Sequence, residues 1–197
     1  MKLTKTFLMI SLIAIAVAPA WAQRGQGLRN GARNGVGNCL LLQSSDTAQP
    51  LSTAEEKDLM LFREEEKLAR DVYQALFAKW GVRIFNNIAV SEQRHFDAIG
   101  ILIERYGLKD PAQPTAGVFA DPDLQQLYYD LIAKGDVSLL DALQVGVVIE
   151  EKDIKDLKAA MAITDNKDVL RVYSNLLNGS LNHLSAFDSH IDSVSSK

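Results

Sequence analysis

The 197-residue sequence carries 21 Lys and Arg against 25 Asp and Glu, which gives a formal net charge of -4 at pH 7. This acidic balance argues against a nucleic-acid partner. The single cysteine, Cys39, excludes an internal disulfide framework, so the fold must rest on its apolar core or on bound metal.

The first 22 residues have the order of a secretory signal peptide. Lys2 and Lys5 precede an apolar run, Phe7 to Val17, that is too short to span a bilayer comfortably, and Ala20-Trp21-Ala22 follows it. We expect cleavage after Ala22 and a periplasmic or secreted mature chain without a membrane span. The mature chain keeps 19 Lys and Arg against 25 Asp and Glu, a formal charge of -6.

The mature sequence divides into three parts. Residues 23–51 are rich in Gly, Asn, Gln and Ser and offer too little apolar surface to offset the entropy of ordering, so we expect a flexible leader. Residues 52–192 have the usual size of one domain. Residues 193–197 are expected to be a C-terminal tail.

Helical patterns fill the expected domain. Ser52 and Glu55 form a capping box before a helix expected over about 53–79, and after the turn WGVRIFN a second helix is expected over about 86–106. Asp121 and Pro122 begin a short helix that ends at Gly135. Two further long helices are expected, over about 138–162 and 167–191.

The connections between these helices predict their arrangement. The turn between the first two helices and the turn between the last two are short, so each pair forms an antiparallel hairpin. The segment between the hairpins has roughly 30 residues and is long enough to cross the bundle. The sequence therefore predicts an all-α four-helix bundle with one long crossover that carries a short extra helix.

Polar side chains interrupt the apolar faces of all four long helices. Glu92 and His95 are three residues apart, so both point from one face of their helix toward the same place in the bundle. The other long helices carry an acid or a histidine on or beside their apolar stripes. The candidate positions are Glu66, Glu92, His95, Glu150, Asp153 and His183.

These residue types point to metal. Burying several carboxylates without a counter-charge costs several kcal/mol per ion, so such a group titrates, pairs with Lys or Arg, or holds cations. Two divalent ions would balance four carboxylates. Together with two histidines, the carboxylates form an N/O ligand set suited to iron or manganese.

Neighbouring acids compete for two of these positions. Glu64, Glu65 and Glu66 cannot all face inward; the apolar stripe favours Glu66, Glu65 remains a rival, and the remainder is expected on a solvated face. Glu151 competes with Glu150 in the same way. The rival account of the whole group is a structural salt-bridge network, for which the basic residues nearby in sequence are Lys67, Arg70, Arg94 and Lys152.

Four segments carry a family resemblance: REEEKLARDVY, NIAVSEQRHFDAI, VGVVIEEKDIKDL and NGSLNHLSAF. The layout resembles the ferritin-like di-iron carboxylate superfamily, in which two helices each give a Glu and two each give Glu-x-x-His. More narrowly, residues 51–191 are similar to the exported bacterial family DUF2202. The resemblance implies Glu66 and Glu150 as the single glutamates and Tyr73 as an aromatic beside the centre. It also implies Glu92 and His95 as one Glu-x-x-His pair.

The last helix departs from this pattern, because Ser180 stands three residues before His183. A serine cannot replace a bridging carboxylate. We expect Asp153 to compensate, as a second acid on the same helix does in rubrerythrin-like proteins. Without that compensation the site holds one metal or none.

The resemblance implies an exported protein that binds two iron or manganese ions per chain. It would react with dioxygen or peroxide or oxidise iron(II), as an oxidoreductase of ferroxidase or peroxidase type, with Tyr73 as a catalytic hydrogen-bond donor or electron relay. The expected partners are metal ions and small oxidants, and a homodimer is left open. The alternative is an exported helical binding or structural module that has lost the metal chemistry.

Overall fold

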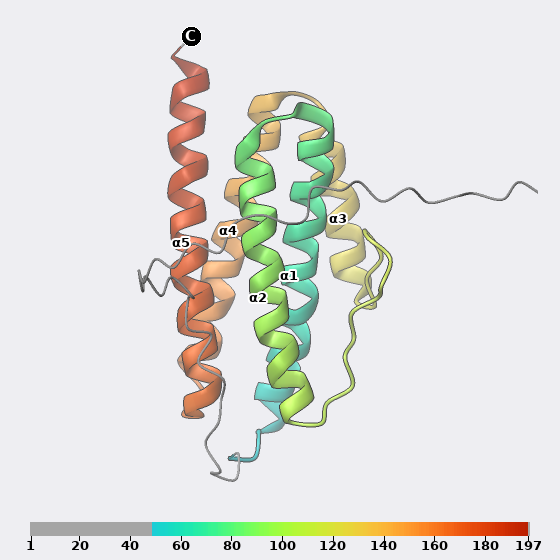
Figure 1. Cartoon of the computed structure of the whole chain (residues 1–197), viewed down its shortest axis with the longest axis vertical. Coiled ribbons are helices and arrows are strands. Elements are labelled where there is room, and N and C mark those ends of the chain that lie inside the picture. The colour runs from blue at the N-terminus through green and yellow to red at the C-terminus, as the bar shows by residue number, and fades with distance from the viewer. Residues whose placement is uncertain (1–48, 197) are drawn as a thin grey trace, which may run out of the picture. The chain divides into compact units, whose positions relative to one another are not determined.

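The computed structural model describes residues 49–196, and the regular structure in this part of the chain is entirely helical. Its five helices are α1 (Thr53–Trp80), α2 (Arg83–Arg105), α3 (Pro122–Gly135), α4 (Leu139–Met161) and α5 (Lys167–Ser195) (Figure 1). The predicted all-α class is confirmed. The expected signal peptide, Cys39 and nearly all of the expected leader lie outside the described residues.

The long helices pack as two hairpins (Figure 1). α1 lies against α2 across the two-residue turn Gly81-Val82, and α4 lies against α5 across residues 162–166. α3 belongs to the connection between the hairpins and packs on both α1 and α4, while α5 also contacts α2. Side chains from α1, α2, α4 and α5 can therefore meet in one interior.

The ends of α1 follow from its capping residues. Ser52 Oγ accepts a hydrogen bond from Glu55 N, and Glu55 Oε2 accepts one from Ser52 N, which is the predicted capping box. Gly81 ends the helix with a φ of 66°, a left-handed conformation that glycine adopts without strain. The longer turn expected before the next helix is wrong, because Gly81 and the extended Val82 suffice to reverse the chain and α2 begins at Arg83.

The C-terminal helix is longer than expected. α5 continues to Ser195, through most of the expected tail, because Ile191 and Val194 still pack against the apolar core. At its other end Asn166 caps the helix, and its side-chain oxygen accepts hydrogen bonds from Asp168 N and Val169 N.

Buried polar contacts tie the connection before α3 to α1. Glu64 is 4% exposed and accepts hydrogen bonds from the backbone amides of residues 120 and 121, at 2.6 and 2.9 Å. Lys67 is 1% exposed and donates to Asp71 and to two backbone carbonyls of the connection. The expectation of a solvated face beside Glu66 is therefore wrong for Glu64, which is buried because it holds the connection in place.

Apolar side chains fill the interior on both sides of one polar level. On α1, Leu59 and Phe62 precede Glu66, whereas Tyr73 and Leu76 follow it, and none of these apolar side chains is more than 1% exposed. α4 repeats the pattern around Glu150, with Leu143 before it and Leu157 after it. The acids at mid-length are thus enclosed by apolar material, where an unpaired charge is costly.

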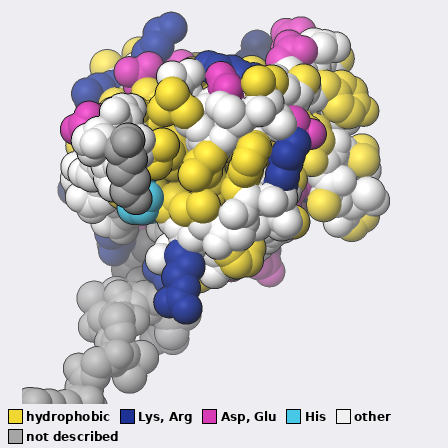
Figure 2. Space-filling model, turned by 90° about the horizontal axis from the view of Figure 1, so that it is seen from above, with side chains coloured by type: hydrophobic (Ala, Val, Ile, Leu, Met, Phe, Trp, Pro, Cys, Tyr) yellow, Lys and Arg dark blue, Asp and Glu magenta, His cyan; other side chains and the backbone are white. Residues whose placement is uncertain are grey.

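Within residues 49–196, no helix combines the length and the apolar content that crossing a membrane requires. Figure 2 shows acidic, basic and apolar side chains interspersed at one end of the molecule. Charges of both signs thus alternate at this end of the described residues.

Candidate metal centre

Five of the six predicted ligands meet at mid-length of the long helices, in two groups that share Glu92. Glu66, Glu92 and His95 form the first group, and Glu92, Glu150 and His183 form the second. Within each group, one ligand atom from every residue lies within 4.8 Å of the others. The groups join side chains from α1, α2, α4 and α5, and Glu92 connects them.

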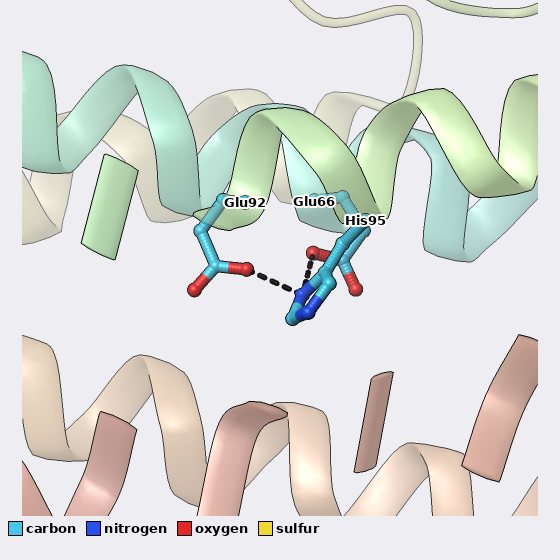
Figure 3. A group of neighbouring side chains, drawn as sticks. All are labelled: Glu66, Glu92 and His95. Carbon is cyan, nitrogen blue, oxygen red and sulfur yellow. Dashed lines mark ion pairs between the residues drawn. The ribbon is translucent and has the colours of Figure 1, made fainter. Parts of the chain in front are cut away.

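The first group comes from α1 and α2, and its side chains point toward α4 and α5 (Figure 3). His95 Nδ1 is 2.7 Å from Glu92 Oε2 and 3.3 Å from Glu66 Oε2. Glu66 and Glu92 are 1% and 2% exposed, and His95 is 9% exposed. The three-residue spacing thus places a carboxylate and an imidazole on one buried face of α2, as predicted.

The second group forms because Glu92 turns its other oxygen toward α5. His183 Nδ1 is 2.8 Å from Glu92 Oε1 and 3.5 Å from Glu150 Oε2. The His95 and His183 rings stack with their centroids 5.7 Å apart. One carboxylate therefore stands between two imidazoles that come from different helices.

These close approaches are not hydrogen bonds. Among the described residues, Glu66 Oε1, Glu92 Oε1 and the Nδ1 atoms of His95 and His183 are buried without a hydrogen-bond partner. A good hydrogen bond needs the N–H to point at its acceptor, and a buried polar atom left unpaired costs about 1–3 kcal/mol. These contacts are Glu–His ion pairs without hydrogen-bond geometry, and the polar atoms left without a hydrogen-bond partner make a donor set that fits a cation bound among them.

Tyr73 contacts the second group. Its hydroxyl donates a hydrogen bond of 2.7 Å to Glu150 Oε1 and makes a longer one of 3.4 Å to Gly146 O. Burial and the neighbouring Glu150 raise the pKa of Tyr73 well above its usual range, so the hydroxyl stays a neutral donor. Tyr73 thus holds one oxygen of Glu150 and leaves Oε2 facing His183.

Two glycines supply space that the rings around the site occupy. A Cβ at Gly179 would lie 2.5 Å from two ring atoms of His95, and a Cβ at Gly146 would lie 2.5 Å from the ring of Phe187. Phe187 in turn packs on Tyr73, with ring centroids 5.4 Å apart. Sequence reasoning missed both glycines, although a glycine inside a helical pattern is the signal that could have found them.

Asp153 lies beside the two groups and belongs to neither. Its Oδ2 accepts a hydrogen bond of 2.5 Å from Ser180 Oγ, and its charge is near enough to Glu66 to raise the pKa of that carboxyl. Asp153, which we expect to compensate for the missing glutamate, is therefore hydrogen-bonded to Ser180, the residue at the position of that glutamate.

The neighbouring acids that competed as ligands differ in their contacts and in their exposure. Glu65 is buried like Glu66, but it forms an ion pair with Lys152 from α4, whereas Glu66 approaches His95. Glu151 is exposed, and Glu150 is 1% exposed. Glu66 and Glu150 are thus the members of these pairs that reach the ligand groups.

Three of the four basic residues of the rival salt-bridge network form ion pairs outside the two ligand groups, and the fourth, Arg94, is exposed. Lys67 and Arg70 both pair with Asp71, at 2.7 Å, and Lys152 pairs with Glu65. In the described part of the chain, no Lys or Arg forms an ion pair with the three glutamates of the ligand groups; their only ionic contacts are to His95 and His183. The charge of these glutamates is therefore not balanced by a permanent cation of the protein.

Burial and mutual repulsion separate the pKa values of the acids. Burial, Asp153 and Glu92 raise the pKa of Glu66 well above its usual range, and burial raises the pKa of Glu150 to about 8. Burial acts the same way on Glu92, but the two imidazoles beside it bring its pKa down to about 2. Burial opposes protonation of His183, yet Glu150 and Glu92 raise its pKa to about 9. Protons therefore stay bound to side chains of the two ligand groups, and they must dissociate when a cation binds.

Comparison with known proteins gives one family and a solved relative. Residues 55–196 match the family model described as "Uncharacterized protein domain (DUF2202)". The chain is 50% identical over 145 residues to the uncharacterized protein MJ0754 of Methanocaldococcus jannaschii, which is 73% of this chain and 78% of the relative. The crystal structure of the hypothetical protein MJ0754 from Methanococcus jannaschii matches with a TM-score of 0.75 at 48% identity, over 77% of this chain and 87% of that chain.

Proposed function

The chain belongs to the DUF2202 family, and we propose that it is an exported, ferritin-like protein whose two ligand groups bind two iron or manganese ions. In this proposal α1, α2, α4 and α5 are the helices of a ferritin-like four-helix bundle, and α3 lies in its crossover. That class takes a Glu from each of two helices and Glu-x-x-His from each of the other two. The places of Glu66, Glu150 and the Glu92–His95 pair support this assignment, and Ser180 is the departure from it.

The observation that carries the proposal is the position of Glu92. Each of its oxygens faces one imidazole nitrogen, at 2.7 and 2.8 Å, and both nitrogens lack a hydrogen-bond partner in the described residues. Glu92, His95 and His183 would hold the ions together with Glu66 and Glu150, and this combination of carboxylate oxygens and imidazole nitrogens suits iron or manganese.

The charge of the carboxylates supports the binding of two divalent ions. Glu66, Glu92, Glu150 and Asp153 supply four negative charges when ionised, and none of them forms an ion pair with Lys or Arg within residues 49–196. Cation binding requires deprotonated carboxylates and neutral imidazoles, so the stored protons leave as the ions enter.

The proposed reaction is an oxidation of ferroxidase or peroxidase type. When bound, iron(II) or manganese(II) supplies the electrons that reduce dioxygen or peroxide. The chain's own side chains have two roles at the site. Tyr73 orients Glu150 by a hydrogen bond, and the apolar layers on both sides exclude water. The neutral Tyr73 hydroxyl also places a proton at Glu150 Oε1.

Metal counting tests this function. Protein purified without chelator and loaded anaerobically with iron(II) or manganese(II) should hold about two ions per chain. Glu92→Ala should lose most of both ions, because it removes the carboxylate that the groups share. Glu151→Ala, an exposed acid on α4, is the matched control and should bind as the wild type does. A wild type that binds neither metal would contradict the proposal.

One contact favours the alternative, an exported helical module without metal chemistry. The hydrogen bond from Ser180 gives one oxygen of the Asp153 carboxylate, Oδ2, a partner within the protein, so that oxygen is satisfied without metal. In that case the loaded protein would hold no metal, and both the wild type and Glu92→Ala would keep the fold.

A further inference from the structure

A cavity of about 40 Å³ lies between α1, α3 and α4, against the carboxylates of the candidate metal centre. Its walls are apolar and include Ala69 of α1, Leu124, Leu127 and Leu131 of α3, and Val148 and Ile149 of α4. Its floor is formed by Glu66, Glu92, Glu150 and Asp153. The cavity therefore joins an apolar wall to the acidic side of the site.

α3 gives the cavity three of its seven apolar lining residues. Leu124, Leu127 and Leu131 are spaced by three and four residues, so they share one face of this helix. Glu64 and the buried Lys67 hold the connection before α3 against α1, which keeps that face over the site. The short extra helix in the crossover thus has a defined position relative to the carboxylates.

The cavity runs from an exposed rim to a buried floor. Val148 is 42% exposed and Leu127 is half-buried, whereas Leu124 and Leu131 are each 4% exposed. The ion pair between Lys152 and Glu65 also lies at the lining, and the Lys152 side chain is 39% exposed. A molecule that enters between Leu127 and Val148 therefore passes apolar side chains before it meets a carboxylate.

The apolar part of this lining disfavours ions. A hydrated cation would have to shed water beside leucine and valine side chains that offer no ligand, which costs several kcal/mol or more. His95 and His183 do not line the cavity, and their side chains are each 11% exposed, against 1–2% for the glutamates that they face. The imidazoles are thus the more exposed side chains of the two ligand groups.

An uncharged apolar molecule meets no such cost. Apolar cavities bind small nonpolar guests such as xenon, and a cavity of this size accommodates a diatomic gas. Hydrogen peroxide carries hydroxyl groups that find no partner among the leucine and valine side chains, so the apolar part of the lining favours dioxygen over peroxide.

We propose that the cavity between α1, α3 and α4 is the binding site of a small uncharged apolar molecule, dioxygen, which enters between Leu127 and Val148. The consequence for the reaction rests on the proposed function, because it makes dioxygen the oxidant that the site admits from this side. Binding in the cavity itself requires no metal.

Xenon is the probe for the cavity. Crystals of the metal-free full chain under xenon pressure should show xenon between Leu127 and Val148. Leu127→Trp and Val148→Trp fill the cavity from opposite walls and should each abolish the bound xenon. Leu181→Trp, at an apolar position of α5 that is 43% exposed, is the matched control and should leave xenon in place.

The same variants test the route after loading with iron(II). Both tryptophan variants of the rim should bind metal as the wild type does, within about twofold, but consume dioxygen at least about tenfold more slowly at limiting dioxygen. Their reaction with peroxide should change less than about twofold. Melting curves show whether each rim variant folds. If one of them does not fold, the other variant tests the route.

Each result separates the two proposals. A wild type without xenon in the cavity overturns the binding site. Xenon binding together with equal dioxygen consumption in wild type and rim variants overturns the route. Xenon binding in a wild type that takes up no metal upholds the binding site, while the proposed function fails.

Discussion

Ser180 Oγ donates a hydrogen bond of 2.5 Å to Asp153 Oδ2 across the α4–α5 pair. Ser180 is fully buried at the place where Glu-x-x-His would have its glutamate. Asp153 lies next to the two ligand groups without joining either of them. The hydrogen bond therefore orients the carboxylate that we propose as the substitute for the missing one.

We expect Asp153→Ala to lower the bound iron(II) or manganese(II) from about two ions per chain to about one. Four carboxylates neutralise two divalent ions, whereas three leave a net positive charge in a buried site. Metal counting after anaerobic loading measures the change. Asp156→Ala is the matched control, since Asp156 is one turn further along α4 and already pairs with Lys152.

Ser180→Glu tests the same assignment from the other side. If Asp153 supplies the fourth carboxylate, the wild type already holds two ions and Ser180→Glu adds none. A wild type with one ion that gains a second in Ser180→Glu would contradict the role of Asp153.

Bound metal should stabilise the fold. A metal that binds only the folded state adds about 2.7 kcal/mol at a hundredfold excess over Kd. For a domain of this size we expect manganese(II) to raise the Tm of the chelated protein by roughly 5–10 °C in scanning calorimetry. His95→Ala should lose most of this shift, and His190→Ala, an exposed histidine of α5, should keep it. An unchanged Tm of the wild type would count against binding.

The metal-free protein should lose stability as the pH rises from about 4.5 to about 9. Folding raises the pKa of Glu150 to about 8, of Glu65 to about 7 and of His183 to about 9, from ordinary values of 4.5, 4.5 and 6.5. The folded state therefore binds more protons than the unfolded state in this interval, and the free energy of unfolding falls as they dissociate. Glu92 acts oppositely: its stabilisation is present above pH 4.5 and is lost as the pH falls toward 2.

Urea unfolding of chelated protein at about pH 5, 7 and 9 measures this slope. Glu150→Gln removes one of the titrating groups and should flatten the curve between about pH 4.5 and 8. A free energy of unfolding that is constant across the interval would show that the carboxyls do not retain their protons.

The helices and the ligand faces could be predicted because each rests on a local rule. The capping box of Ser52 and Glu55 marks the start of α1 from two side chains, and the spacing of Glu92 and His95 places both on one face of α2. The apolar stripe correctly favoured Glu150 over the exposed Glu151.

Contacts between helices could not be predicted in the same way. A stripe identifies the buried side of one helix but not the partner opposite it, so the pairing of Glu65 with Lys152 was not foreseen. Nor was the burial of Glu64, whose partners are backbone amides of a distant segment. The packing of His95 against Gly179 likewise depends on how α2 and α5 approach each other.

Gly179→Ala should displace the His95 ring. The added Cβ would lie 2.5 Å from its Cε1 and Nε2 atoms, closer than carbon and nitrogen can approach, so the imidazole must move away from Glu92. We expect manganese(II) affinity to fall about 10–100-fold in calorimetric titration. Helix propensity favours alanine by up to about 1 kcal/mol, which offsets strain in the metal-free protein.

Gly100→Ala is the control for Gly179→Ala. It makes the same change within α2, where the Cβ meets the end of the flexible Arg63 side chain. Its metal affinity should equal that of the wild type. Equal affinities in all three proteins would show that Gly179 does not position His95.

Tyr73→Phe should weaken the centre without removing a ligand. It deletes the hydroxyl that donates to Glu150 Oε1 and leaves that buried oxygen unpaired, at a cost of about 1–3 kcal/mol in the free energy of unfolding. We expect metal affinity to fall about 10–100-fold while the stoichiometry stays at about two ions per chain, because the hydroxyl orients Glu150 and does not bind metal.

Tyr173→Phe removes an equally buried hydroxyl of α5 that has no hydrogen-bond partner in the described residues, so it should cost no stability. If Tyr73 also relays electrons, a single turnover with saturating metal will be slower in Tyr73→Phe than in Tyr173→Phe. Equal affinities and equal rates in the two variants would reduce Tyr73 to a core residue.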